Sequence, residues 1–243
     1  MATYYSPRIV TDGLVLCLDA GNIKSYPGTG TTWSDLVSNL SAVKGGSQSP
    51  TYPQYNSNSS NGWFTFTGGV VANNYSRFDV ANIPSFSALS AFAWFRTTNT
   101  TDSKTIIRMD NSDFELSMNQ SSSAFVCAGT NWNDIAVQQT AAGTDGIWHE
   151  IGLTFTGAVL TAYFDGSSLG VANRATSTTT AAGTLKIGTR DDGYTPRSKT
   201  TAGKWSRCTS STDASQRNIF VLKFLLDCFF KRAVHDCSCS LSL

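Results

Sequence analysis

Charged side chains are scarce in this chain of 243 residues: Asp, Glu, Lys and Arg make up 14% of it, and the net charge is +1. A nucleic-acid-binding surface needs an excess of Lys and Arg to displace counterions from phosphates, so this balance argues against a nucleic-acid partner. No apolar run reaches the roughly 20 residues that a membrane-spanning helix requires, and we expect no membrane partner. The amino terminus lacks the basic and apolar segments of a secretion signal, which favours a chain that stays where it is synthesised.

Glutamate is almost absent, since Glu115 and Glu150 are the only two in the sequence. Polarity comes instead from Ser, Thr, Asn and Gly, which favour strands, turns and loops over helices. Hydrophobic residues make up 40% of the chain and aromatic residues 12%, an ordinary composition for a folded domain with a core. We therefore expect an all-β protein with few helices.

Cysteine is unevenly distributed along the chain. Cys17 and Cys127 lie in apolar runs and are expected to be buried free thiols, without a disulfide framework. The other four of the six cysteines fall within residues 204–243. That segment holds 6 basic and 3 acidic residues, whereas residues 1–203 hold 12 basic and 14 acidic residues. This shift in composition divides the chain into a domain of residues 1–203 and an atypical, Cys-rich, apolar tail of residues 204–243.

Short apolar or alternating runs bounded by Gly, Asn, Asp, Ser and Thr recur along residues 13–188, which predicts about a dozen strands in an antiparallel two-sheet sandwich or barrel. The Asp165-Gly166 pair tolerates the positive φ angles of a tight turn and predicts a hairpin. The expected strands lie within residues 14–18, 63–67, 90–96, 105–109, 114–118, 124–128, 135–137, 148–155, 159–165, 169–171 and 185–187.

Three segments carry a family resemblance: DGIWHEIGLTF at 145–155, LTAYFDG at 160–166 and LKIG at 185–188. Their order and spacing resemble the laminin-G-like domains of the concanavalin A-like lectin/glucanase jelly rolls. The opening GLVLCLDAGN at 13–22, with TWSDL at 32–36, is similar to the version of this domain in structural proteins of tailed bacteriophages.

The resemblance implies an antiparallel jelly-roll sandwich and a non-catalytic virion structural protein, a capsid decoration or a tail-associated part. Such a protein is made in the host cytoplasm and resides in the virion. Its implied partners are other virion proteins, host-surface glycans through a lectin-like domain, and further copies of itself. Because lectins, glycosidases, adhesins and structural modules all share this fold, the fold alone does not identify the function.

The laminin-G-like pattern continues with one more strand, which pairs near the amino-terminal strand. The sequence of the tail does not match that strand. The codons permitted for residues 204–218, read in a neighbouring frame, can spell VEQVYIFNRRLSAE, which is a strand of the expected kind. We therefore interpret the tail as a frame-shifted reading. A missing closing strand would leave a sheet edge unpaired, and such edges recruit other chains, so we expect poor solubility.

The aromatic residues of the family motifs are assigned to the core. Trp148 is large enough to fill the space between two sheets, and Trp94 and Tyr163 are placed in the same core. His149 follows Trp148 and is then expected to point toward a loop or solvent.

Catalytic and metal sites have little support in the sequence. Glycosidases of this fold need two carboxyl groups that flank the sugar, and Asp113-Phe-Glu115 is the only Asp-x-Glu pair on an expected strand. We expect no catalysis and no required cofactor. Asp110 and Asp113 offer oxygen ligands for Ca²⁺, as do the segments 131–134 and 191–193, although each has an ordinary turn composition as well.

A glycan site is expected where an exposed aromatic ring lies between amides and carboxylates, because a sugar ring packs its C–H face on the aromatic ring. Trp132 stands between Asn131, Asn133 and Asp134, and Tyr194 offers a second position. The alternative is that Trp132 folds back over the sandwich edge. Two other functions remain open: a carbohydrate-binding module of a cellular protein and, less favoured without paired carboxylates, a glycoside hydrolase or lyase.

Overall fold

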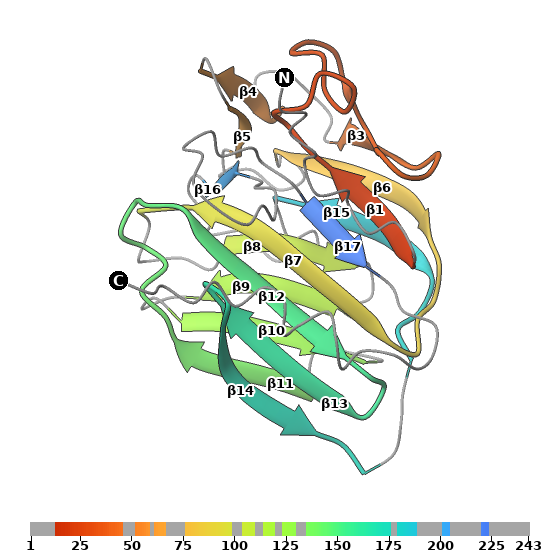
Figure 1. Ribbon diagram of the computed structural model, residues 1–243, viewed down its shortest axis with the longest axis vertical. Coiled ribbons are helices and arrows are strands. Elements are labelled where there is room, and N and C mark those ends of the chain that lie inside the picture. Colours follow the sequence, from red (N-terminus) through yellow and green to blue (C-terminus); the bar gives the residue numbers. More distant parts are fainter. Residues whose placement is uncertain are drawn as a thin grey trace, which may run out of the picture.

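The chain folds as two facing antiparallel sheets, shown in Figure 1. The computed structural model describes residues 13–45, 52–58, 61–66, 76–98, 104–109, 114–119, 123–129, 135–175, 179–188, 201–204 and 220–223. None of these residues is helical, so none belongs to a helix that could cross a membrane. The all-β, antiparallel two-sheet sandwich expected from the sequence is confirmed.

The first sheet contains the strands of the DGIWH and YFDG segments. Its strands follow the order β14, β13, β12, β7, β16, β5 and β4, and β17 joins β1 to β7. The bounds are β1 Leu14–Leu18, β4 Gln54–Ser57, β5 Gly62–Phe66, β7 Leu89–Arg96, β12 His149–Phe155, β13 Val159–Phe164, β14 Ser167–Asn173, β16 Thr201–Lys204 and β17 Phe220–Lys223.

The second sheet lies behind the first in the view of Figure 1, where β8, β9 and β10 are seen past β7 and β12. Its strands follow the order β11, β10, β9, β8, β15, β6, β3 and β2. The bounds are β2 Thr32–Ser34, β3 Ser41–Gly45, β6 Arg77–Ile83, β8 Lys104–Met109, β9 Phe114–Asn119, β10 Ser123–Ala128, β11 Ile135–Thr140 and β15 Gly183–Ile187.

The hairpin between β13 and β14 turns at the position that the sequence predicts. Asp165 has a φ of 47° and Gly166 a φ of 74°, the pair of positive values that a tight hairpin turn needs. The turn fixes the register in which Phe164 opposes Ser167. It thereby holds the Asp165 side chain beside the start of β12.

The interior between the sheets is apolar and rich in aromatic rings. Phe64 is fully buried, and its ring centroid lies 4.7 Å from that of Trp33 and 4.7 Å from that of Phe78. Trp33 thus anchors the long amino-terminal segment to the core. Cys17 and Cys127 are buried free thiols, as expected, and burial, with the nearby charges of Asp35 and Asp19, raises the pKa of Cys17 to about 12.

The tail contributes a strand to the first sheet. β17 pairs with β1 and also with residues 90–92 of β7, while β16 pairs with residues 95–96 of the same strand. Figure 1 shows β17 in blue beside β1 in red. The edges that a lost closing strand would expose on β1 and β7 are therefore paired by tail residues. The frame-shifted reading stays a prediction, which the nucleotide sequence tests directly.

Three aromatic residues assigned to the core lie on its outer side, and the structure corrects that assignment. The inward positions of β12 are His149, Ile151, Leu153 and Phe155, which are all buried. Because side chains alternate between the two faces of a strand, Trp148 lies on the outer face, where it is only partly buried.

The same alternation places Trp94 outward on β7, between the buried Ala93 and Phe95. Tyr163 lies outward on β13, and its ring centroid is 6.0 Å from that of Phe92 on the same face. The expectation for His149 is wrong as well, because this residue is only 4% exposed. Parity along the strand, and not side-chain size, decides which face each residue takes.

Candidate functional site

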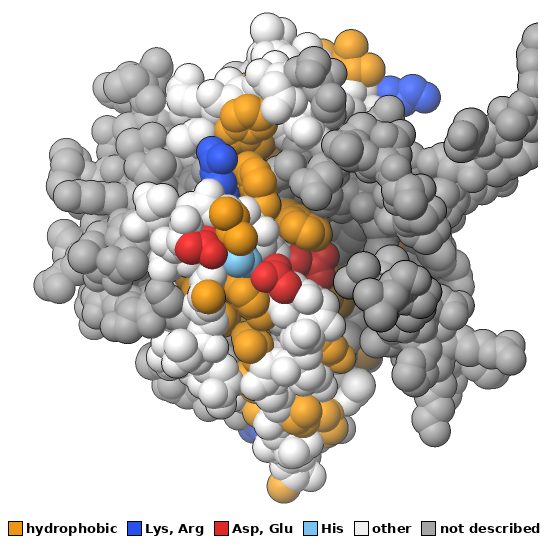
Figure 2. Space-filling model, turned by 60° about the vertical axis from the view of Figure 1, so that its left-hand side comes forward, with side chains coloured by type: hydrophobic (Ala, Val, Ile, Leu, Met, Phe, Trp, Pro, Cys, Tyr) orange, Lys and Arg blue, Asp and Glu red, His pale blue; other side chains and the backbone are white. Residues whose placement is uncertain are grey.

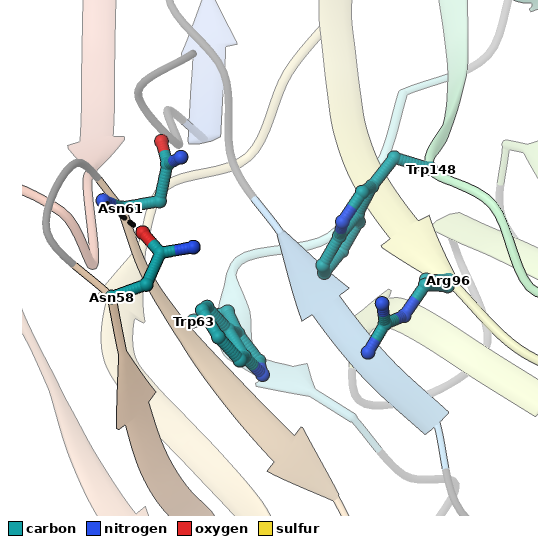
Figure 3. A pocket seen from close by; sticks show the side chains of 5 residues that line it. All are labelled: Asn58, Asn61, Trp63, Arg96 and Trp148. Carbon is teal, nitrogen blue, oxygen red and sulfur yellow. Dashed lines mark hydrogen bonds between the residues drawn. The ribbon is translucent and has the colours of Figure 1, made fainter. Parts of the chain in front are cut away.

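A small pocket opens on the outer face of the first sheet, with a volume of about 100 Å³. Its lining comes from three places in the chain. Trp63 lies on β5, Arg96 at the end of β7, and Trp148 just before β12; Asn58 and Asn61 flank the turn between β4 and β5. Figure 3 shows the two indoles on either side of the pocket, with Arg96 beside Trp148 and the two asparagines on the side of Trp63.

Alternation along β5 and β7 produces this arrangement. On β5 the buried Phe64 and Phe66 face the core, so Trp63 and Thr65 face outward. On β7 the buried Ala93 and Phe95 place Arg96 outward. The strands β5, β16 and β7 are neighbours in the sheet, so Trp63 and Arg96 lie two strands apart on one face.

Hydrogen bonds fix the turn that carries the two asparagines. The Asn58 backbone N–H donates to the Asn61 carbonyl at 2.9 Å, and the Asn61 N–H donates to Asn58 Oδ1 at 2.9 Å. The Oδ1 atom of Asn61 is buried and has no hydrogen-bond partner within the described ranges. A buried carbonyl oxygen without a donor is costly.

The loop before β12 positions Trp148. Gly146 adopts a φ of 86°, and its N–H donates to the Thr97 carbonyl at 3.1 Å, which docks the loop against the end of β7. The Arg96 guanidinium lies over the Trp148 ring, 5.1 Å from the ring centroid. This cation–π contact fixes the indole and the guanidinium relative to one another.

His149 holds the same loop from its inner side. Its Nδ1 lies 2.7 Å from Asp165 Oδ2, and its Nε2 lies 3.0 Å from Asp145 Oδ1. Ionised carboxylates only accept hydrogen bonds, so a doubly protonated imidazole can donate to both of them at once. In Figure 2 the pale blue histidine lies between red carboxylates, with orange hydrophobic side chains around it.

Two opposing effects act on the pKa of His149. Burial lowers this pKa, but the hydrogen bonds and charges of Asp165 and Asp145 together raise it above the ordinary value of 6.5. The Asp145 pKa is lowered, first by its hydrogen bond from the Ile147 N–H and then by His149. His149 therefore links the loop that carries Trp148 to the β13–β14 hairpin, and the raised pKa favours its protonated form.

We expect the stability that His149 contributes to decrease as the pH rises. A folded-state pKa above the unfolded value gives a contribution that is complete below about pH 6.5 and is lost as the pH passes through the folded-state value. Denaturant unfolding of the wild type and of His149→Gln, measured from pH 6 to 8.5, should show a wild-type advantage of at least about 1 kcal/mol at pH 6 that shrinks toward pH 8.5. A constant or growing advantage would contradict the doubly protonated state.

No carboxylate is among the described residues that line the pocket. Glu150 hydrogen-bonds with Trp94, and burial, aided by the Asp165 charge, raises the pKa of Glu150. Glu115 lies buried on β9, where it contacts Thr105 and Arg108. Sugar hydrolysis needs two carboxyl groups beside the scissile bond.

Most of the site residues expected from the sequence lie outside the described residues: Asn131, Trp132, Asn133, Asp134 and Tyr194 of the glycan site, and Asp110 and Asp113 of the calcium site. These assignments stay predictions. Across the ranges that the structure does describe, no group of three His, Cys, Asp or Glu side chains is placed to hold a metal ion.

Sequence reasoning missed Trp63, Arg96 and the asparagine pair. The signal for Trp63 was present, because it alternates with Thr65 and opposes the inward Phe64 and Phe66. The signal for Trp148 was the inward run Ile151, Leu153 and Phe155, which extends back to His149. Nothing local in the sequence indicates that these positions meet, since the pairing of β5, β16 and β7 brings them together.

Comparisons with solved structures find the same fold in binding domains of botulinum neurotoxins. A structure of botulinum neurotoxin type C matches with a TM-score of 0.60 and 13% identity. The cell entry of that toxin is described as dependent on interaction with two ganglioside molecules. The binding domain of botulinum neurotoxin DC matches in complexes with rat synaptotagmin II, at a TM-score of 0.60 and 15% identity, and with SialylT, at 0.59 and 14%.

Each of these matches covers 90% of this chain and 50% of the other, so the chain spans about half the length of these structures. At such identities the likeness shows the fold alone. No curated protein sequence matches the chain.

A family model described as the concanavalin A-like lectin/glucanases superfamily matches residues 67–205, which is more than half of the 243 residues. The match includes the DGIWH, YFDG and LKIG segments. Its fold is that of lectin-like, carbohydrate-binding domains. From the two facing sheets and this match, the chain belongs to the concanavalin A-like lectin/glucanases superfamily.

Proposed function

We propose that the chain is a non-catalytic glycan-binding module and that a sugar ring occupies the pocket between Trp63 and Trp148. The observation that carries this proposal is the pair of partly buried indoles on either side of one pocket, with a guanidinium and two carboxamides in the same lining. Apolar faces with a few placed polar groups are the usual composition of a ligand site.

The dimensions favour a single ring over a long chain. Pockets for drug-sized ligands measure about 300–1,000 Å³, whereas this one measures about 100 Å³. The C–H face of a pyranose packs on an indole, and its hydroxyls find donors and acceptors in Asn58, Asn61 and Arg96. The described lining offers no carboxylate as a general acid or base to a bound sugar, which supports binding without hydrolysis.

We further propose that the module belongs to a virion surface protein, with other virion proteins and host glycans as its partners. The support is the resemblance of residues 13–22 and 32–36 to tailed-bacteriophage structural proteins. The neurotoxin relatives of the same fold include a complex with SialylT and a protein receptor complex, so both glycan and protein partners are compatible with the fold. Mass spectrometry of purified particles tests the location.

Binding to a glycan array tests the proposed site. The wild type should bind a subset of glycans, and Trp148→Ala should weaken that binding on the order of 30-fold, because a buried Trp at the centre of a site commonly contributes 2 kcal/mol or more. Trp94→Ala is the matched control, since this indole lies on the same face but does not line the pocket.

Trp132→Ala separates the pocket from the loop site expected from the sequence. The proposal requires that Trp132→Ala and Trp94→Ala retain binding. Loss of binding in Trp132→Ala with retention in Trp148→Ala would move the glycan to the 131–134 segment and overturn the pocket assignment.

A further inference from the structure

The charge of the pocket indicates which class of sugar it selects. Arg96 is the only charged side chain among the described residues that line the pocket. Its guanidinium is positive at every physiological pH. None of the ion pairs found in the described part of the chain involves Arg96, whose recorded contact is the ring of Trp148.

Three carboxylates of β12 and the adjoining loops have other partners. Asp145 and Asp165 bond the two nitrogens of His149, at 3.0 Å and 2.7 Å. Glu150 bonds Trp94. The positive charge of Arg96 therefore has no negative counterpart in the described lining, and a bound anionic ligand would supply one.

The contact of Arg96 with Trp148 is made over the ring, with Cζ 5.1 Å from the ring centroid. A guanidinium that stacks on an aromatic ring uses its flat face for the contact, and its N–H groups point outward in the plane. Figure 3 shows the guanidinium extending from β7 toward the space between the two indoles. The planar fork of N–H groups matches the two oxygens of a carboxylate. An alcohol or an amide has only one oxygen and cannot accept both hydrogen bonds in this way.

We propose that the pocket selects a pyranose that bears a carboxylate, held by Arg96 while its ring packs against an indole. This inference rests on the proposed function, because it names the ligand class of the same pocket. Hexuronic acids and sialic-type acids share this chemistry, and both belong in the test. Charge-assisted hydrogen bonds of this kind correspond to a preference of at least about tenfold over the uncharged counterpart.

Titrations of tryptophan fluorescence with matched sugar pairs test the inference. Glucuronate is compared with its methyl ester and with glucose, and a sialylated oligosaccharide with its asialo form. The wild type should bind the acid of at least one pair about tenfold or more tightly than its neutral counterpart, and rising salt should reduce the preference.

Three variants give the expected pattern its controls. Arg96→Gln should lose the preference, because its affinity for the acid falls much further than its affinity for the neutral sugar. Arg96→Lys should recover part of the preference, since Lys keeps the charge without the fork. Lys24→Gln removes an equal charge from an exposed loop position and should leave the preference intact. Circular dichroism verifies that each variant is folded.

The outcomes separate this inference from the function on which it rests. Equal binding of acid and neutral sugar by the wild type, or an acid preference that survives in Arg96→Gln, overturns the inference. If acid and neutral sugar bind equally and Trp148→Ala abolishes that binding, the proposed function stands while the inference falls. Absence of binding to every sugar overturns both.

Discussion

Phe64→Ala is expected to lower the free energy of unfolding by about 3–5 kcal/mol, the range measured for a large aromatic residue truncated inside a packed core. Phe64 is fully buried on β5, and its ring contacts those of Trp33 and Phe78 from the second sheet. Tyr26 and Tyr55 pack on it as well, with centroids 4.8 Å and 5.5 Å away. The substitution would leave a cavity in the layer that joins both sheets to the amino-terminal segment.

Equilibrium unfolding in urea measures this loss. Val43→Ala on β3 is the matched control, because Val43 is 46% exposed and its truncation should cost less than about 0.5 kcal/mol. An effect of Phe64→Ala below about 1 kcal/mol, or one equal to that of Val43→Ala, would contradict a core organised around this ring.

Gly188→Ala is expected to destabilise the fold by about 2–4 kcal/mol, because it combines backbone strain with overpacking. Gly188 ends the LKIG segment with a φ of 94° and donates its N–H to the Ile106 carbonyl at 2.9 Å. A Cβ atom at this position would lie 2.0 Å from Cδ1 of Phe66, a ring that is 2% exposed. The glycine of this family motif is therefore required by space as well as by conformation.

Gly30→Ala separates the two causes. Gly30 has a similar φ of 98°, but no atom lies within 4 Å of the Cβ that alanine would add. Its substitution should cost only the conformational strain, about 1–2 kcal/mol. Thermal unfolding of both variants measures the two losses of stability. A Gly30→Ala variant as unstable as Gly188→Ala would contradict a destabilising contact between the added Cβ atom and Phe66.

The longer strands could be predicted because their apolar residues alternate or run continuously. The runs at 63–67, 90–96, 148–155 and 159–165 correspond to β5, β7, β12 and β13. The short strands β2, β3 and β4 are rich in Ser, Thr, Asn and Gln and have no such pattern, so tertiary pairing defines them. β6 carried a usable signal, since Phe78 and Val80 are buried and flank the outward Asp79.

The candidate site was harder to predict than the fold for two physical reasons. First, Trp148 and Trp94 were assigned to the core by size, although strand parity places both on the outer face. Second, the pocket joins residues 58–63, 96 and 148, which only the strand order of the first sheet brings together. A local search for an aromatic residue between polar neighbours finds Trp132 and cannot find such a composite surface.

The most direct test of a sugar bound between Trp63 and Trp148 is the nuclear magnetic resonance spectrum of the six indole N–H groups during titration with a glycan that the array identifies. Single Trp→Phe variants assign each signal. We predict that the signals of Trp63 and Trp148 shift together and saturate at one affinity, while that of the buried Trp33 stays in place. Saturable shifts confined to Trp132, with both pocket indoles unmoved, would contradict the account.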